Sequence, residues 1–309
     1  MSTNPLNIVI IPASTKVGAA TIRALLSRSS TEIRVTGVYR NPSRAPEEFL
    51  SNPNFSARQG DVEDAESLDF KGADAVLSIT PTWHDGRDLV EIAKQVSENV
   101  KRAIEKEEGS GKGVKRVVVL SSFGAQYDHG TGAILMNHAA EEVFKDLKVP
   151  ETVFMRPGYF MENWATAVET VKEGGFLFGT ITPTSMEFPH IAIKDIGEAC
   201  AKELLAAGTA LPSSPYPFEL LGPVYSTEDV RKVFAQVSGK EVEIREIPKE
   251  GLLEFYGAVF PPSVAKYYAD MNVSLLEGGI LSEHPEPTAD VRQDGKTELV
   301  EVIRELYGA

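Results

Sequence analysis

Three polar side chains near the middle of the chain have the chemistry of acid–base groups. Ser122 ends an apolar run, where its hydroxyl could orient a carbonyl or iminium group. Tyr127 follows in the next loop, and His138 could act as an acid near neutral pH because the reference pKa of histidine is about 6.5. Each also has a structural interpretation as a cap, a surface aromatic or a hydrogen-bonded helix residue. Ser122, Tyr127 and His138 are therefore catalytic candidates.

The turn at residues 12–18 could bind a phosphate. It lies between an apolar run and a helical pattern, which is the order of a dinucleotide-binding unit, although of the expected glycines only Gly18 is present. Hydroxyls, N–H groups and an ammonium group at a helix start can replace a glycine cradle, with weaker binding. A buried strand and helix without a ligand is the alternative. The residues expected to contact phosphate are Pro12, Ser14, Thr15, Lys16 and Val17.

Arg40 follows the second apolar run and indicates which nucleotide is preferred. A fold that binds NAD places a carboxylate here, whereas one that binds NADP uses an arginine for the 2′-phosphate. Arg40 therefore favours NADP(H), unless it belongs to a solvated basic turn. Asp61, after the third run, could lie beside the adenine or cap a helix start.

The elements that must position these residues alternate between strand and helix. Apolar runs typical of strands cover residues 7–11, 32–39, 55–59, 73–80 and 116–120. Such alternation predicts right-handed crossovers and one parallel sheet, with ligands outside the carboxyl ends of its strands. We therefore expect Thr80, Pro81 and Ser121 to border the cofactor, and Trp83 to border the substrate.

The last third of the sequence changes character. Proline-rich turns occur at residues 211–217, 260–262 and 284–287. We expect an α/β fold in which a Rossmann-type doubly wound parallel sheet carries a smaller α+β C-terminal substrate lobe. The nucleotide-binding domain is predicted at 1–157, with 188–222 returning to it, and the lobe at 158–187 and 223–309.

Composition excludes several classes of function. The chain has 309 residues and a net charge of -14, which would repel a nucleic acid backbone. The five histidines are scattered, so no metal site is predicted. No apolar run reaches the roughly 18 residues of a membrane helix, and the single Cys200 suits a reducing compartment. We expect a cytoplasmic monomer or homodimer that acts on a small molecule and binds neither nucleic acid nor membrane.

Several short motifs together resemble one family. They are Arg40-Asn-Pro, Gly60-Asp61, Ser121-Ser122, Arg156-Pro-Gly-Tyr-Phe-Met-Glu-Asn163, Ile193-Lys-Asp-Ile-Gly197 and Leu220-Leu-Gly-Pro223. In this order the chain is similar to the NmrA-like group of atypical short-chain dehydrogenase/reductases, over about residues 6 to 250. The resemblance implies a Rossmann domain, an NADP-type cofactor and functions from reductase to redox-sensing regulator. Members similar to the fungal ergot-alkaloid reductases act on iminium groups in secondary metabolism.

One departure from that family concerns catalysis. A typical dehydrogenase pairs a tyrosine with a lysine four residues later, and the lysine lowers the tyrosine pKa. Here His138 stands at the lysine position and Ile134 at the tyrosine position. His138 could instead contact the nicotinamide ribose or act as an acid.

The segment after the strand at 152–155 should face the reactive end of the cofactor. Pro157 and Gly158 make a turn there, and Tyr159 begins a run of aromatics at helical spacing. Such spacing is also typical of a core. The resemblance further suggests that residues 191–195 form a strand returning to the nucleotide-binding domain, with Asp195 capping the next helix. The residues predicted at the cofactor are Pro157, Gly158 and Tyr159, and those predicted at the substrate include Phe123, Phe160 and Trp164.

The favoured hypothesis is an NADPH-dependent reductase of a small organic substrate. An iminium is already cationic and needs a hydride but little proton donation, so the missing pair would not prevent its reduction. The alternatives are a cyclase or isomerase on the same fold, and a non-catalytic NADP(H)-sensing regulator.

Overall fold

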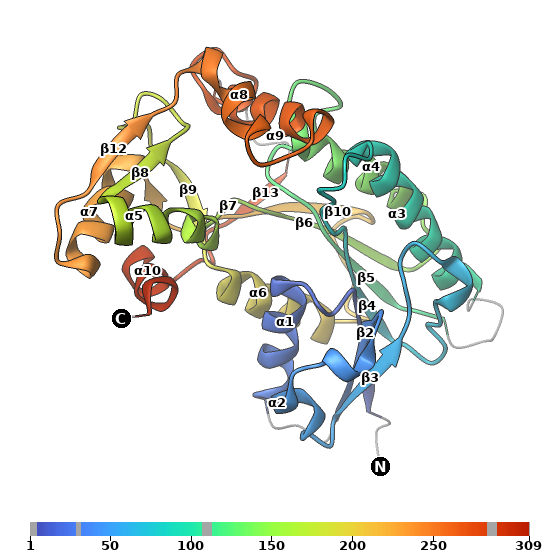
Figure 1. The fold of residues 1–309 in the computed structure, drawn as a ribbon. Helices are drawn as coiled ribbons and strands as arrows, with labels where there is room; N and C mark the ends of the chain where they lie inside the picture. The colour runs from blue at the N-terminus through green and yellow to red at the C-terminus, as the bar shows by residue number, and fades with distance from the viewer. Residues whose placement is uncertain (1–4, 29–31, 107–112, 283–288, 309) are drawn as a thin grey trace.

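A parallel sheet forms the centre of the molecule. The computed structural model describes residues 5–28, 32–106, 113–282 and 289–308 (Figure 1). Within them, eight strands lie in the order β13-β10-β6-β5-β4-β1-β2-β3, and every neighbouring pair is parallel. The strands are β1 (Leu6–Ile11), β2 (Ile33–Tyr39), β3 (Phe55–Gln59), β4 (Ala75–Ile79), β5 (Arg116–Leu120), β6 (Glu151–Pro157), β10 (Tyr216–Leu220) and β13 (Asp290–Arg292).

Helices cover both faces of this sheet, as Figure 1 shows. One face packs against α1 (Lys16–Leu26) and α6 (Ile193–Leu205), and the other against α3 (Leu89–Lys106) and α4 (Leu135–Phe144). In β5, Val118 contributes to the first hydrophobic cluster and Val117 to the second. Both faces of the strand are buried, which explains its continuous apolar sequence. The predicted Rossmann-type α/β fold is confirmed.

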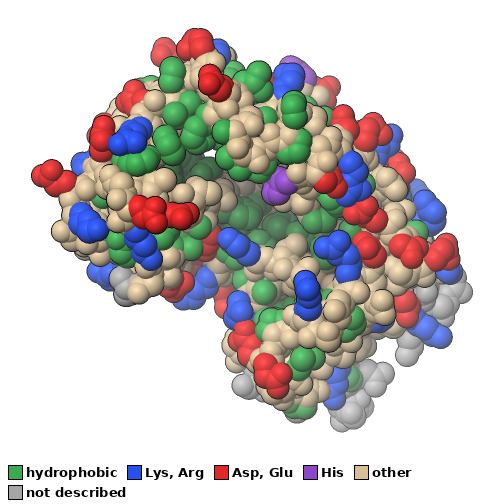
Figure 2. All heavy atoms as spheres, viewed as in Figure 1, with side chains coloured by type: hydrophobic (Ala, Val, Ile, Leu, Met, Phe, Trp, Pro, Cys, Tyr) green, Lys and Arg blue, Asp and Glu red, His purple; other side chains and the backbone are tan. Residues whose placement is uncertain are grey.

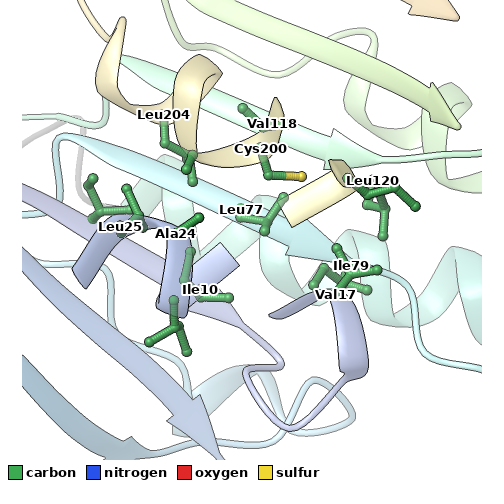
Figure 3. Close-up of a cluster of buried hydrophobic side chains, with 14 of the residues drawn as sticks. Ile10, Val17, Ala24, Leu25, Leu77, Ile79, Val118, Leu120, Cys200 and Leu204 are labelled. Carbon is green, nitrogen blue, oxygen red and sulfur yellow. The ribbon is translucent and has the colours of Figure 1, made fainter. Parts of the chain in front are cut away.

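The first of these clusters lies between the sheet and two closely packed helices. Ile10, Leu77 and Leu120 meet side chains of α1 and α6 there, and the thiol of Cys200 is buried among them (Figure 3). The helices approach so closely that a Cβ on Gly197 would lie 2.7 Å from the Cβ of Ala20. Cys200 is therefore a small core residue, in keeping with the pKa of its thiol, which burial raises to about 12.

Two smaller sheets build a lobe beside the carboxyl edge of the large sheet (Figure 1). Strands β7 (Tyr159–Phe160), β9 (Phe188–Ile191) and β11 (Val224–Tyr225) form one, and β8 (Phe176–Gly179) pairs in parallel with β12 (Glu243–Glu246) in the other. Around them pack α5 (Val168–Gly174), α7 (Thr227–Ser238) and α10 (Leu299–Tyr307). This lobe has its own core, to which Val171, Phe234 and Ile303 contribute.

Two further helices connect the lobe with the loops of the large sheet. They are α8 (Leu252–Gly257) and α9 (Pro262–Leu275), and α9 lies against η4 (Gly132–Ile134) so closely that a Cβ on Gly132 would be 2.1 Å from the backbone nitrogen of Met271. The remaining short elements are η1 (Pro42–Arg44), α2 (Glu47–Leu50), η2 (Ala65–Ser67), η5 (Met161–Ala167) and η6 (Lys249–Gly251).

Two expectations about the second half of the chain are wrong in detail, and a third cannot be compared with the structure. Tyr159 and Phe160 do not begin a helix, because they pair as β7 with β9, and the helical segment that follows is the 3-10 helix η5. Residues 191–195 do not form a strand of the large sheet: β9 ends at Ile191, and α6 begins at Ile193. The proline-rich turn expected at 284–287 lies outside the described residues.

Asp195 also has a different role from the predicted cap. Its carboxylate accepts hydrogen bonds from the backbone N–H groups of Lys296 and Thr297, both at 2.8 Å, and from the Thr297 hydroxyl. Asp195 therefore holds the segment that precedes α10 against α6.

Candidate cofactor and substrate site

The loops that carry the predicted site residues meet at one edge of the large sheet. The chain runs from β1 to β2 and β3 on one side, then returns to β4 on the other side of β1. Ile11 pairs with Ser78 and Leu120 with Met155, so the strand ends are level. Neighbouring strands lie about 4.8 Å apart. The turn after β1 thus lies next to the loop after β4, at the switch point where such folds bind ligands.

Thr15 organises the turn between β1 and α1. Its hydroxyl accepts a hydrogen bond from the N–H of Gly18 at 3.0 Å and donates one to the carbonyl of Pro12 at 3.2 Å. Thr15 is therefore the N-cap of α1, and its side chain is already in use. The N–H groups of Lys16 and Val17 have no acceptor among the described residues, so they remain open to an anion.

Gly18 keeps the role of a glycine in this degenerate turn. A Cβ there would lie 3.0 Å from the carbonyl oxygens of both Pro12 and Ala13. The helix start thus approaches the turn as closely as a dinucleotide-binding turn requires. Val17 is 4% exposed, so only its backbone faces the site, whereas Ser14 and Lys16 are exposed.

A groove of about 650 Å³ runs from this turn along α1 to Ser27, beside the first half of α6. Lys16 and Lys194 line it, together with the carboxylate of Glu162. The two Glu162 oxygens accept the N–H of Ile193 at 2.9 and 3.0 Å, and burial raises the pKa of this carboxyl group. Glu162 satisfies the first N–H of α6, which has no side-chain cap of its own.

Arg40 is the exposed residue after β2. Its guanidinium forms no ion pair or hydrogen bond within the described parts of the chain. Asp61, in the next loop, accepts the N–H of Glu63 at 3.0 Å, and its own N–H bonds to the Ser67 hydroxyl at 2.8 Å. Asp61 thus shapes its loop, and the helix start that it was expected to cap is capped by Asp64.

Thr80 and Pro81 are half-buried just after β4, as expected for a loop that borders the switch point. Trp83, predicted at the substrate, contacts the loop after β3. Its indole N–H donates to Glu63 at 3.0 Å, and the guanidinium of Arg87 lies 5.8 Å from its ring. Its ring also packs beside Leu89 and other apolar residues near α9.

Ser121 belongs to a buried polar network that sequence reasoning missed. Its hydroxyl donates to Glu141 at 2.6 Å, and Arg156 donates twice to the same carboxylate, at 2.8 and 2.6 Å. All three side chains are buried. The network ties the ends of β5 and β6 to α4, so Ser121 positions the loops and its hydroxyl is not free for the cofactor.

The three catalytic candidates follow this network along the chain. The Ser122 hydroxyl donates to the carbonyl of Phe123 at 3.1 Å. Nδ1 of His138 lies 2.9 Å from the carbonyl of Ala125, so Nδ1 carries the proton and Nε2 is left for another partner. The hydroxyl of Tyr127 is buried and has no hydrogen-bond partner among the residues that the structure describes. No hydrogen bond between any two of the three side chains is found.

The loop after β6 follows the same edge of the sheet. The Pro157 carbonyl accepts the N–H of Phe123 at 2.9 Å, and the N–H of Gly158 donates to Leu220 at 3.0 Å. A Cβ on Gly158 would lie 2.9 Å from the carbonyl of Pro189. Pro157 and Gly158 therefore join the loop after β5 to the small sheet.

The structure separates the aromatic residues that were predicted to form a substrate wall. Trp164 is 8% exposed, and its indole N–H donates to His190 at 3.3 Å within the core of the lobe. Phe160 packs against the cluster between the large sheet and α1, and Phe123 lies beside Tyr127 in another cluster. Trp164 is therefore a core residue, the alternative that its spacing also allowed.

His190 holds the middle of this aromatic cluster. Its Nδ1 donates to the Phe188 carbonyl at 2.9 Å, and burial lowers its pKa to about 4. Tyr159 packs edge-on against Phe188, with ring centroids 5.3 Å apart. Burial raises the pKa of the Tyr159 hydroxyl, because it disfavours the charged phenolate. At neutral pH this cluster is uncharged.

A second aromatic group, not predicted from the sequence, comes from α8, α9 and the loop after β4. Phe260 stacks on Tyr268 with centroids 4.8 Å apart, and His84 stacks on Phe260 at 4.9 Å. Tyr256 lies 5.8 Å from Tyr268 and accepts a hydrogen bond from Asn272 at 2.7 Å. Figure 2 shows a hollow between the lobe, these helices and the large sheet, with hydrophobic side chains in its depth.

Among the described residues, no group of three or more histidine, cysteine or acidic side chains is placed to hold a metal ion. None of the helices in the described ranges combines the length and apolar character needed to cross a membrane.

Comparisons with solved structures agree with this fold. The NADP(H) complex of the Citrobacter sp. triphenylmethane reductase is 18% identical, with a TM-score of 0.72, and the match covers 97% of this chain and 99% of that one. The NADPH complex of an Escherichia coli NADPH-dependent quinone oxidoreductase is 18% identical, with a TM-score of 0.70 and coverage of 98% and 100%. A Staphylococcus aureus nucleoside-diphosphate-sugar epimerase is 15% identical, with a TM-score of 0.67 and coverage of 98% and 96%.

Comparisons of the sequence gave a match to a family model. No curated protein matches the chain in sequence. The family model described as NAD(P)H-binding matches residues 13–205, which is more than half of the chain and includes the turn before α1, Arg40 and the loops after β4, β5 and β6. The chain therefore belongs to the NAD(P)H-binding family.

Proposed function

We propose that this protein is an NADPH-dependent reductase of a small organic substrate, of the NmrA-like type of atypical short-chain dehydrogenase/reductase. The observation that carries the proposal is the pairing of an open phosphate turn with an unpaired arginine. The free N–H groups of Lys16 and Val17 lie at the start of α1, and Arg40 directly follows the neighbouring strand β2. The first pair suits a pyrophosphate, and Arg40 suits the 2′-phosphate that distinguishes NADP from NAD.

The remaining loops support a position for the reactive end of the cofactor. With the phosphates at the turn after β1 and the 2′-phosphate at β2, the nicotinamide extends toward the ends of β4, β5 and β6. Thr80, Pro81, Pro157 and Gly158 lie at those ends. Tyr159 continues from Gly158 into the small sheet, between the large sheet and the aromatic cluster of the lobe.

The chemistry proposed here is reduction of an imine, an iminium or a related group. Bound NADPH supplies a hydride. Ile134 and His138 occupy the places of the tyrosine and lysine of ordinary dehydrogenases, so strong proton donation is missing, and a cationic substrate would not need it. Nε2 of His138 and the unpartnered hydroxyl of Tyr127 are the groups that could hold a proton near the substrate.

Aromatic side chains at one end of the lobe are evidence for a hydrophobic substrate. The side chains of Tyr256, Phe260 and Tyr268 present aromatic surface at the end of the lobe that faces the loop after β4. Such surface binds flat apolar molecules and attracts cations through the ring faces. One of the structurally similar proteins is named as a reductase and another as an NADPH-dependent quinone oxidoreductase, and this agrees with the proposal.

Cofactor binding tests the first half of the proposal. Titration of the protein with NADPH and NADH, followed by nicotinamide fluorescence, should show tighter binding of NADPH. Arg40→Ala should weaken NADPH by about tenfold or more and leave NADH nearly unchanged, since only NADPH carries the 2′-phosphate. Arg34→Ala, at the start of the same strand, is the matched control. No saturable binding of either nucleotide would refute the assignment.

Turnover tests the second half. The NADPH absorbance should fall with a cyclic iminium substrate and much more slowly with a ketone of the same shape. His138→Ala and Tyr127→Phe should lower the rate more for a neutral imine than for an iminium, because only the imine needs a proton. Equal effects on both substrates would leave these residues structural.

A non-catalytic NADP(H)-sensing regulator is the second candidate. The observation in its favour is that the Ser122 hydroxyl and Nδ1 of His138 are both used within their own loop. It predicts tight NADPH binding with no oxidation of the cofactor by any imine. A cyclase or isomerase on the same fold predicts product formation without net loss of NADPH.

A further inference from the structure

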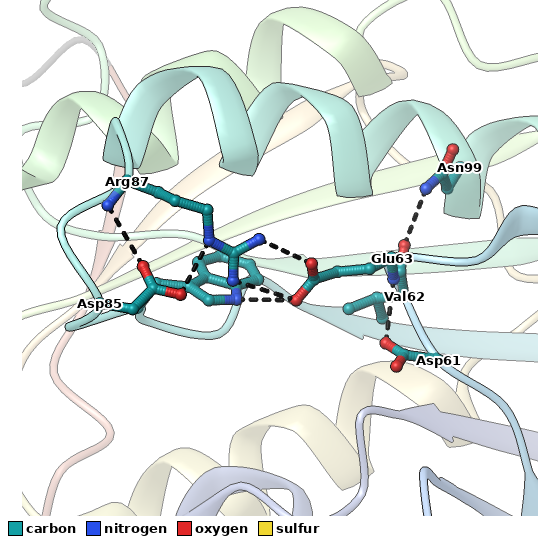
Figure 4. A network of polar contacts seen from close by, with 7 residues as sticks. Asp61, Val62, Glu63, Asp85, Arg87 and Asn99 are labelled. Carbon is teal, nitrogen blue, oxygen red and sulfur yellow. Dashed lines mark hydrogen bonds and ion pairs between the residues drawn. The ribbon is translucent and has the colours of Figure 1, made fainter.

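An exposed charge cluster lies next to Arg40, in the loops after β3 and β4. Arg87 lies between two carboxylates, Asp85 and Glu63, as Figure 4 shows. Its Nη1 is 2.7 Å from Oε2 of Glu63 and its Nη2 is 3.3 Å from Oε1. Its Nε donates to Asp85 at 2.8 Å.

Every oxygen of the Glu63 carboxylate is occupied in this arrangement. Arg87 takes both oxygens, and the indole N–H of Trp83 takes Oε1 from a second direction. The backbone of the same loop is also fixed, because the N–H of Glu63 donates to Asp61 at 3.0 Å and Asn99 donates to the Val62 carbonyl at 2.9 Å (Figure 4).

Arg40 lies close enough to compete for this carboxylate. It follows Tyr39, which pairs with Gln59 at the end of β3, and the Gly60 N–H donates to the Tyr39 carbonyl at 3.0 Å. The hydrogen bond from Arg87 is the main cause that lowers the pKa of Glu63, and the charge of Arg40 lowers it further. Glu63 is therefore ionised and within electrostatic reach of Arg40, yet the two form no ion pair.

We propose that Arg87, with Trp83, acts as a positioning residue for cofactor choice, by holding Glu63 so that Arg40 stays free for the 2′-phosphate of NADPH. The inference rests on the proposed binding of NADP(H). A carboxylate at this edge is the group that NAD-binding sites use for the ribose hydroxyls and that would repel a 2′-phosphate. Arg87 neutralises Glu63 and binds both of its carboxylate oxygens, so that the carboxylate does not pair with Arg40.

The test compares the dissociation constants of NADPH and NADH across four proteins: the wild type, Arg87→Ala, Trp83→Phe, and the double variant Arg87→Ala with Glu63→Gln. Arg87→Ala should reduce the preference for NADPH roughly threefold to fivefold, the upper end of the effect of one exposed charge near a protein surface. Trp83→Phe should have a smaller effect in the same direction. The double variant should return the preference to within about twofold of the wild type.

Arg28→Ala is the matched control. Arg28, just beyond the C-terminal end of α1, forms an ion pair of the same length, 2.7 Å, with the exposed Glu198 of α6. The variant should leave the preference unchanged. Adenosine 2′,5′-bisphosphate, which carries the 2′-phosphate without the nicotinamide, should follow NADPH in every variant.

The outcomes separate this inference from the proposed function. If the wild type binds neither nucleotide, the proposed function fails. If the wild type prefers NADPH through Arg40 but Arg87→Ala leaves the preference intact, the positioning role alone is wrong. If Glu63→Gln does not restore the preference, Arg87 contacts the phosphate directly and the role of Glu63 is refuted.

Discussion

Replacing Glu141 by alanine should destabilise the protein strongly. The Glu141 and Arg156 side chains are only 7% and 6% exposed, and they form a bidentate ion pair. Truncating the carboxylate would leave the buried guanidinium without a counter-charge and the Ser121 hydroxyl without its acceptor. Removing one partner of a buried pair costs about 3–5 kcal/mol. Because whole domains are stable by about 5–15 kcal/mol, the loss would be a large part of the total.

Urea unfolding followed by circular dichroism would measure this cost. The midpoint should move to lower urea with an unchanged slope, as expected when stability changes without a change in the surface exposed on unfolding. Glu142→Ala is the matched control: Glu142 is the next residue of α4, is exposed, and pairs with the exposed Lys145. It should cost less than about 1 kcal/mol.

A second variant separates the charge from the packing. Glu141→Leu combined with Arg156→Met replaces the ion pair by apolar groups, which often restores most of the stability lost by a single change. The reasoning would be refuted if Glu141→Ala cost less than about 1 kcal/mol, or if the double change were as damaging as Glu141→Ala alone.

Three further predictions concern other parts of the structure. Gly18→Ala should lower the free energy of unfolding by about 1–3 kcal/mol, because the new Cβ would meet two carbonyl oxygens at 3.0 Å. Thermal melting would measure this loss. Gly257→Ala, with open space around the Cβ, is the control and should be neutral or slightly stabilising. Burial lowers the pKa of His190 to about 4, so on acidification the unfolded state binds the proton before the folded state does. The free energy of unfolding should therefore be highest above about pH 6.5 and should fall by up to about 3 kcal/mol as the pH drops toward 4. His190→Gln should flatten that part of the curve of unfolding free energy against pH. Tyr127→Phe should raise the melting temperature slightly or leave it unchanged, because the hydroxyl is buried without a partner; a loss of more than about 1 kcal/mol would show a hydrogen bond that the structure lacks.

The sequence predicts the large sheet well because its signals are local. Strands β3 and β5 begin and end at the residues predicted, since their apolar and β-branched runs are bounded by turns. Helix α3 at Leu89–Lys106 has an equally local signal, because its apolar residues recur every three or four positions. The pattern of apolar residues in these segments thus predicts both the type of element and the side that is buried: both faces of β5, and one stripe of α3.

The lobe is less predictable because its elements depend on distant partners. Strand β8 pairs in parallel with β12, and neither has an alternating pattern strong enough to indicate its partner. Strand β13 has three residues and is defined by its pairing with β10. The aromatic spacing from Tyr159 to Trp164 fits a helix as well as it fits a strand followed by a 3-10 helix. Only the pairing of β7 with β9 decides between them.

Some residues of the candidate site could likewise be predicted from the sequence, and others could not. The turn before α1 and Arg40 could be identified because both follow apolar strands at the edge where ligands bind. The two polar networks could not be, since Arg156 reaches a glutamate 15 residues away and Arg87 one 24 residues away, with no periodic signal. Trp164 shows the limit of side-chain type alone: it is predicted at the substrate but lies in the core of the lobe.

The path of the chain between the large sheet and the lobe has a consequence for biosynthesis. After β6 the chain enters the lobe, returns with α6 and β10, leaves again, and comes back once more as β13 before ending in α10. Residues 290–292 supply an edge of the large sheet, and Leu299, Val302 and Ile303 supply part of the core of the lobe. Neither part can therefore finish folding on the ribosome until residues near 300 have emerged, and the unfinished chain is the stage at which we expect it to depend most on chaperones.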